Sequence, residues 1–181
     1  LDVDGEGDPI ALAEARQTTF ARRKRLKTST PTIRDFSRVE TAYLKSDQRQ
    51  YLIACPHCGE HQALEWGATT AHGIKWRKDA DGQPLPDTAH YVCRHHGCII
   101  EEHHKATMLV CTQLGGAAHW QARNPGARVR GYHLSSLYSP LGWLSWAQIV
   151  REWLAARAAQ KQGDSSLMRA FVNTRLAETW E

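Results

Sequence analysis

The strongest hydrophobic pattern in this chain lies near its end, where apolar residues recur at helical spacing. Ser145 precedes this pattern and Gln148 follows three residues later, which is the spacing of a helix capping box. The stripe that this helix would turn toward the core consists of Trp146, Ile149, Val150, Trp153 and Leu154. A last helix is predicted to begin at Asp164 or Ser165 and to bury Leu167, Met168, Phe171 and Val172.

The N-terminal quarter of the chain predicts two helices and one short strand. Asp8 and Pro9 form a favourable helix start, with the aspartate as N-cap and the proline at the first helical position. Residues 26–30 have the composition of a short strand, which the following proline ends. Ser37 and Glu40 have the capping-box spacing, so a second helix is expected to follow.

The middle of the chain predicts short strands separated by glycine- and proline-containing turns. The expected strands cover residues 51–53, 63–66, 74–76, 90–92, 119–122 and 129–134. A short helix is expected to end near Val110. Together these elements predict an α+β or mixed α/β fold. No apolar run approaches the roughly 20 residues that span a bilayer, so no membrane partner is expected.

The cysteine content changes this picture more than the overall composition does. Hydrophobic residues make up 41% of the 181 residues, which permits a packed core. The chain begins at Leu1 and its only methionines are Met108 and Met168, so we expect it to be part of a longer protein. No secretory pattern is present, so disulfides are not the expected state of the five cysteines. Cys111 stands in an apolar run and is interpreted as a buried free thiol.

The charge distribution permits contact with nucleic acid. The formal net charge is +4, which alone does not establish such contact. One short stretch concentrates the basic residues that would contact DNA phosphates, namely Arg22, Arg23, Lys24, Arg25 and Lys27. The alternative interpretation is a solvated helix end, where cations are electrostatically favoured.

Four of the cysteines form two close pairs. Cys55 and Cys58 are separated by two residues, and Cys93 and Cys98 by four. A Cys-x-x-Cys turn directs two thiolates at one point, and four such ligands form the tetrahedron that zinc prefers. Gly59 permits the positive φ that the turn after the second ligand often needs. These four cysteines therefore predict one zinc ion, and because they leave no open position for water, the zinc is expected to be structural.

Other interpretations of the cysteines remain open. His96 lies three residues after Cys93 and could replace Cys98 as the fourth ligand. A thiol oxidoreductase would place the first pair at the start of a helix, and Gly59 and the second pair argue against that. A zinc deaminase needs an upstream His-x-Glu and a proline where Ala54 stands. A set of ordinary buried thiols is the remaining possibility.

Several segments resemble one family, the large subunit of phage terminase of the lambda-like GpA type. They occur in the family's order over nearly the whole chain: Gly5-Glu6-Gly7-Asp8-Pro9, Ser29-Thr30-Pro31-Thr32, Ser37-Arg38-Val39-Glu40, Cys55-Pro56-His57-Cys58-Gly59, Tyr138-Ser139-Pro140 and Phe171-Val172-Asn173-Thr174. Such proteins package viral DNA with an N-terminal ATPase and cut the concatemer with a C-terminal nuclease. The resemblance implies ATP and Mg²⁺ as cofactors of the intact protein. It implies double-stranded viral DNA, the small terminase subunit and the portal of the prohead as partners, in the host bacterial cytoplasm.

The resemblance places this chain between the two active centres. It contains no Gly-Lys-Ser or Gly-Lys-Thr phosphate loop, and the nuclease carboxylates are expected beyond Glu181, so the chain alone is expected to be inactive. Asp2 and Asp4 follow no apolar strand and are interpreted as loop carboxylates. One ATPase element is implied: Ser29 or Thr30, at the tip of the predicted strand, would couple nucleotide state to movement. Alternatively, both hydroxyls cap the following turn.

The expected organisation has three parts. Residues 1–49 would be the trailing part of a parallel-sheet ATPase domain, and residues 50–112 a small β-rich lobe that resembles a zinc ribbon. Residues 113–181 would form strands and helices that lead toward the nuclease domain. The alternative function is a free-standing zinc-ribbon module that binds nucleic acid or protein, with further phosphate contacts from Arg123, Arg128 and Arg130.

Overall fold

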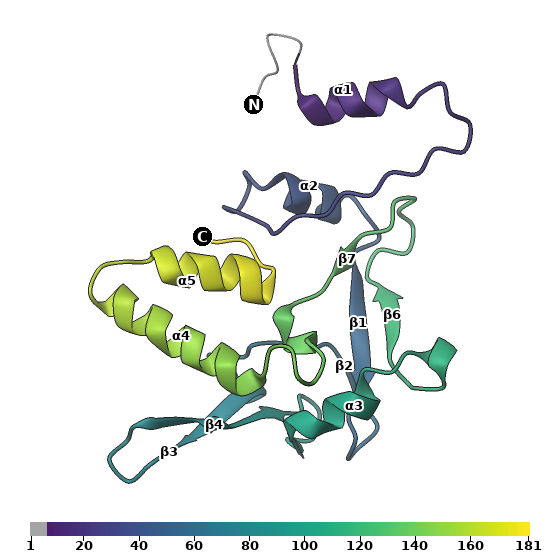
Figure 1. The fold of residues 1–181 in the computed structure, drawn as a ribbon. Helices are drawn as coiled ribbons and strands as arrows, with labels where there is room; N and C mark the ends of the chain where they lie inside the picture. Colours follow the sequence, from purple (N-terminus) through teal and green to yellow (C-terminus); the bar gives the residue numbers. More distant parts are fainter. Residues whose placement is uncertain (1–6) are drawn as a thin grey trace.

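The computed structural model has a mixed α+β fold made of two small sheets and several helices (Figure 1). It describes residues 7–181, so Asp2 and Asp4 lie outside the described residues. The predicted α+β class is confirmed. None of the helices in the described range is both long and apolar enough to cross a membrane.

The first sheet is built around β1 (Arg49–Ala54), which has partners on both sides. It pairs antiparallel with β2 (His61–Gln62) and β6 (His119–Ala122), and parallel with β7 (Tyr132–His133). The Ile53 side chain of β1 is completely buried. The sheet therefore brings together segments that are about eighty residues apart in the chain.

The second sheet consists of β3 (Gly73–Lys78), β4 (Pro84–Val92) and β5 (Ile99–Ile100) in antiparallel order. Tyr91 of β4 lies opposite Ile100 of β5, and both side chains are completely buried. The first cysteine pair lies between β1 and β2 of the first sheet, and the second pair lies between β4 and β5 of the second sheet.

The C-terminal helices form where the sequence predicts them, but Leu167, which was predicted to be buried, is 50% exposed. The helix α4 (Trp146–Lys161) begins after Ser145, whose hydroxyl accepts a 3.1 Å hydrogen bond from the backbone N–H of Gln148. It packs against β4 and against α5 (Ser166–Phe171), which continues into a π-helical turn, η4 (Val172–Leu176) (Figure 1). The predicted apolar stripe is confirmed as core, because Trp146, Ile149 and Val150 are completely buried.

The N-terminal helices form where the sequence predicts them, although one cap differs. Asp8 caps α1 (Pro9–Arg16) and accepts from the backbone N–H of Ile10 at 3.4 Å. The helix α2 (Arg38–Leu44) follows Ser37, whose hydroxyl accepts instead from the backbone N–H of Thr32 at 3.2 Å. The predicted capping box of α2 is therefore not formed.

Four short elements connect the sheets and the long helices. They are η1 (Glu102–His104), α3 (Lys105–Met108), η2 (Thr112–Leu114) and η3 (Ser136–Tyr138). The first two form the helical segment that was expected to end near Val110.

The expectation of a parallel-sheet ATPase portion in residues 1–49 is wrong for the described part of that range. Apart from the first residue of β1, it holds α1, α2 and an extended connection (Figure 1). The predicted strand at residues 26–30 does not form, and Leu26 is 89% exposed. A strand requires hydrogen-bonded neighbours, and no described segment pairs with this one.

Two other predicted strands are reduced or missing. Residues 63–66 alternate correctly in burial, with Leu64 and Trp66 facing the core, but they join no sheet. The backbone N–H of Leu64 donates to the Tyr138 hydroxyl at 2.7 Å instead of to a neighbouring strand. The predicted strand at residues 129–134 shortens to β7.

Candidate metal centre

The first cysteine pair lies in the turn between β1 and β2. The backbone N–H of Gly59 donates to the carbonyl oxygen of Cys55 at 2.9 Å, and the N–H of Cys55 donates to the carbonyl oxygen of Glu60 at 2.9 Å. Gly59 has a φ of +78°, a conformation that favours glycine. These bonds fold residues 55–60 into a closed turn that holds Cys55 and Cys58 side by side.

The second pair lies in an equivalent turn between β4 and β5. The N–H of Gly97 donates to the carbonyl of Cys93 at 3.0 Å, and the N–H of Cys93 donates to the carbonyl of Cys98 at 2.9 Å. Gly97 has a φ of +66°. The two turns thus share one backbone pattern although their cysteine spacings differ.

Three of the four sulfurs form one compact group, and that of Cys93 lies next to it. Those of Cys55, Cys58 and Cys98 lie within 4.8 Å of one another, and the Cys58 and Cys93 sulfurs are 3.8 Å apart. Tetrahedral zinc with Zn–S bonds of about 2.3 Å places its sulfurs about 3.8 Å apart. The imidazole of His96 is exposed, whereas the Cys98 sulfur belongs to the group of three, so the geometry favours Cys98 over His96 as a ligand.

The electrostatic surroundings of these thiols suit a bound cation. Cys55 and Cys93 are almost completely buried, and all four cysteines are free thiols. Burial raises the pKa of Cys55 to about 12. Burial also opposes ionisation of Cys93, but the backbone amides of His96 and His95 donate to its sulfur and hold its pKa below the ordinary value. Four thiolates in one buried space require a compensating cation, which a divalent metal would supply.

Gln62, in β2, supplies a polar group beside this centre. Its Oε1 atom accepts from the backbone N–H of Arg94 at 2.8 Å. Its Nε2 atom is buried without a hydrogen-bond acceptor in the described chain, and the Gln62 side chain is near enough to Cys93 to help lower the pKa of that thiol. An amide donor against a thiolate is the kind of supporting contact that metal–thiolate sites use. The donor set and this orphaned amide both fit zinc.

A buried ion pair joins the end of the second cysteine turn to α4. The Glu102 carboxylate accepts from Lys105 Nζ at 2.8 Å and from the backbone N–H of Trp146, the first residue of α4, at 2.9 Å. The Lys105 side chain is completely buried, and this burial lowers its pKa. Its ammonium lies 4.7 Å from the Trp146 ring, within range of a cation–π contact.

The other predicted site residues are not gathered at this centre. Ser29 and Thr30 are exposed, and the Ser29 hydroxyl donates to the Thr30 carbonyl at 2.9 Å. Arg25 and Lys27 lie 3.1 and 2.5 Å from the Glu14 carboxylate, which leaves them partly neutralised. Cys111 is a free thiol apart from the four, but it is half-buried and not fully buried as predicted.

Sequence spacing alone identified the cysteines, whereas Gln62 and the Glu102–Lys105 pair were missed. The signal for Gln62 was weak: it is a polar residue at the inward position of a short strand after the first turn. The pair offered only a helical i, i+3 spacing, which is common on exposed helices.

Comparison with known proteins agrees with the resemblance seen in the sequence. The family model for the ATPase domain of the phage terminase large subunit gpA matches residues 1–120. The chain belongs to the gpA family of terminase large subunits. A second model, for the endonuclease domain of the terminase large subunit gpA, matches residues 129–181. No solved structure matches.

Two curated terminase large subunits match almost the whole chain. The protein of Enterobacteria phage P21 is 33% identical over 193 residues, and that of Escherichia phage lambda is 30% identical over 194. Each match covers 99% of this chain, which spans 28% of the length of either relative. The first match ends within β6 and the second begins shortly before β7, and both strands pair with β1.

Proposed function

We propose that this chain forms the junction between the ATPase and nuclease parts of a viral DNA-packaging motor. The single observation that carries the proposal is its match to the two gpA models on either side of residues 121–128. In the intact protein, the activities would be ATP-driven translocation, with ATP and Mg²⁺, and cleavage of the concatemer. The proposed partners are double-stranded viral DNA, the small terminase subunit and the portal of the prohead, in the host bacterial cytoplasm.

The metal centre has a structural role in this proposal. Cys55, Cys58, Cys93 and Cys98 would hold one zinc ion, which supplies the charge that keeps four thiolates together. The two turns belong to different sheets, so joining them fixes the first sheet against the second. The Glu102–Lys105 pair would extend this fixed unit to the start of α4.

The connection between the two matched segments supports a mechanical role. Strand β1, from the segment matched by the ATPase model, pairs with β7, from the segment matched by the nuclease model. The Tyr138 hydroxyl donates to the Tyr51 carbonyl at 2.6 Å and accepts from Leu64, across the same boundary. Movement of one segment would therefore be transmitted to the other through hydrogen bonds and packing. Ser29 and Thr30 remain proposed coupling residues at the ATPase side.

We propose that fewer residues of the basic stretch contact DNA than the sequence suggests. Arg22, Arg23 and Lys24 are exposed, whereas Arg25 and Lys27 pair with Glu14. We expect the affinity for duplex DNA to fall steeply with salt and to be tolerant of sequence, because phosphate contacts release counterions. Fluorescence anisotropy at two salt concentrations measures this. Equal affinity for DNA at the two salt concentrations would contradict phosphate contact.

A free-standing zinc-ribbon module is the alternative, and family membership favours the motor. The three-part organisation into residues 1–49, 50–112 and 113–181 is kept as part of the proposal, with the first part no longer expected to contain a strand at residues 26–30. The zinc assignment is common to both functions, so it does not discriminate between them.

The intact terminase subunit that contains this chain provides the decisive functional test. We expect the double variant Cys55→Ser/Cys93→Ser to lose zinc and to stop packaging DNA into proheads. ATP hydrolysis should persist, because the phosphate loop lies outside these residues. The Cys111→Ser variant is the matched control and should package normally. Normal packaging by the zinc-free double variant would refute the structural role of the metal.

A further inference from the structure

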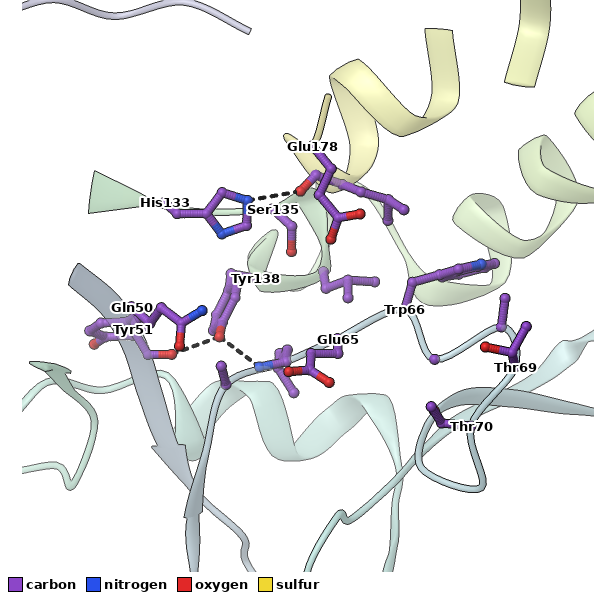
Figure 2. Close-up of a pocket in the computed structure, with 16 residues that line it drawn as sticks. Gln50, Tyr51, Glu65, Trp66, Thr69, Thr70, His133, Ser135, Tyr138 and Glu178 are labelled. Carbon is purple, nitrogen blue, oxygen red and sulfur yellow. Dashed lines mark hydrogen bonds between the residues drawn. The ribbon is translucent and has the colours of Figure 1, made fainter. Parts of the chain in front are cut away.

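A cleft of about 370 Å³ lies beside the start of β1, and the proposed function does not use it. Its walls come from the segment that leaves the first cysteine turn and from the C-terminal segment around η3 and η4 (Figure 2). The residues that determine its chemistry are Glu65, Trp66, His133, Ser135, Tyr138 and Glu178.

Ser135 is the first sign that this cleft takes a ligand. The residue is only 8% exposed, and its hydroxyl has no hydrogen-bond partner within the described chain. Figure 2 shows this hydroxyl pointing into the space between Tyr138 and Glu178. A buried hydroxyl without a partner is costly, so a ligand that hydrogen-bonds with it would be stabilised.

His133 presents a second hydrogen-bond acceptor. Its Nε2 atom lies 3.2 Å from the carbonyl oxygen of Leu176 and 3.1 Å from that of Ala177. Because carbonyl groups only accept, Nε2 carries the proton in a singly protonated ring, and Nδ1 of that tautomer keeps its lone pair. In Figure 2 the other ring nitrogen is turned toward Tyr138.

Two carboxylates complete the set of acceptors. Glu65 uses one oxygen, Oε2, for both Arg94 Nη2 at 2.5 Å and His72 Nε2 at 3.2 Å, which leaves Oε1 available. Glu178 makes no ion pair with the described residues, and its carboxyl points into the cleft (Figure 2). Loss of hydration raises the pKa of this carboxyl, and the neighbouring His133 ring opposes that rise.

The arrangement selects a particular class of ligand. A negatively charged phosphate would be repelled by Glu178, whereas the charge of Glu65 is already paired with Arg94. A bare metal ion needs ligand atoms close to one another, and among the described residues only the cysteine group meets that spacing. A guanidinium group is a planar cation with five N–H donors, and it stacks on aromatic rings such as those of Tyr138 and Trp66.

We propose that the cleft between Glu65, Ser135 and Glu178 binds the guanidinium group of an arginine side chain presented by a protein partner. Glu178 supplies the opposite charge, and the Ser135 hydroxyl and His133 Nδ1 accept from the remaining N–H groups. The cleft is adjacent to the junction of the two matched segments, so its occupant would contact both.

The test uses the zinc-loaded, ¹⁵N-labelled chain titrated with L-arginine amide. We expect saturable chemical-shift changes at the amides of Ser135, Glu178 and Trp66. L-citrulline amide has nearly the same shape but carries a neutral urea group in place of the guanidinium. It should produce no saturable chemical-shift changes at these amides. Mg²⁺ and inorganic phosphate should not compete with L-arginine amide; competition by Mg²⁺ would replace the proposal with a metal site.

Single substitutions separate binding in the cleft from a general effect of the net charge of the chain. Glu178→Gln should raise the dissociation constant roughly tenfold, because it removes a charge-assisted hydrogen bond. Asp81→Asn removes the same charge in the exposed turn between β3 and β4 and should change nothing. Ser135→Ala should weaken binding without lowering the stability of the unliganded chain, because its hydroxyl bonds to nothing there.

The outcome that overturns the proposal is the absence of saturable chemical-shift changes at these amides, or equal affinity of the parent and the Glu178→Gln variant for L-arginine amide.

A separate measurement identifies the protein that supplies the arginine. Concentration-dependent shifts at the same amides, reversed by L-arginine amide, would identify a second copy of this chain as the partner. Without them, the arginine belongs to a different protein.

Discussion

At the scale of single residues, three buried polar side chains have different relations to their surroundings. The Tyr138 hydroxyl has both a donor and an acceptor, Gln62 satisfies only its carbonyl end, and the Ser135 hydroxyl satisfies neither. Buried polar groups are normally paired, and within the described chain these two side chains and Trp66 Nε1 are the exceptions. Gln62 faces the thiol group of Cys93, and Ser135 faces the cleft.

Gln62→Leu is expected to weaken zinc binding. The substitution removes the amide donor beside Cys93 and the acceptor of the Arg94 N–H, both of which orient the second cysteine turn. Loss of such supporting contacts costs roughly ten- to a hundredfold in metal affinity. Competition with a chromophoric chelator measures it. Gln121→Leu, at an exposed position of β6, is the control, and equal affinities in the two variants would rule out a role for Gln62.

The residue scale also shows the limit of sequence reasoning. The four cysteines could be predicted because their spacing is local and zinc requires it. Gln62 and Ser135 could not, because their significance depends on partners that lie far away in the chain or are missing. The ion pairs of Glu14 with Arg25 and Lys27 likewise could not be predicted, because they form only when the chain folds back after α1.

At the scale of elements, local signals predicted helices better than strands. The caps Asp8 and Ser145 and the apolar stripe of α4 act within a few residues, and each is confirmed. The strand predictions at residues 26–30 and 63–66 failed because a strand depends on its neighbours. In the second case the side chains still alternate in burial, and a tyrosine hydroxyl takes the place of the neighbouring strand.

Tyr138→Phe tests how strongly this tyrosine joins separate elements. The change leaves the buried N–H of Leu64 and the carbonyl of Tyr51 without their partner. We expect the free energy of unfolding to fall by about 1–3 kcal/mol in urea denaturation with zinc in excess. Tyr132→Phe, in the half-exposed strand β7, should cost far less. A similar cost for the two changes would show that the Tyr138 bridge contributes nothing.

At the scale of the whole molecule, the chain joins two segments that match different gpA family models. Each of its two sheets holds one cysteine turn, and β1 pairs with strands from both matched segments. The family and the α+β class could be predicted from the sequence, because short motifs recur in order along the chain. The parallel-sheet expectation for residues 1–49 is wrong, because no described segment pairs with the predicted strand at residues 26–30.

The central claim, that four cysteines hold one structural zinc ion, is tested most directly by metal analysis of the purified chain. We expect one zinc per chain in the parent and in the Cys111→Ser and His96→Ala variants. Cys55→Ser, Cys58→Ser, Cys93→Ser and Cys98→Ser should each lose the metal or bind it far more weakly. A zinc-free parent would contradict the claim, and zinc retained in Cys98→Ser but lost in His96→Ala would contradict the ligand set.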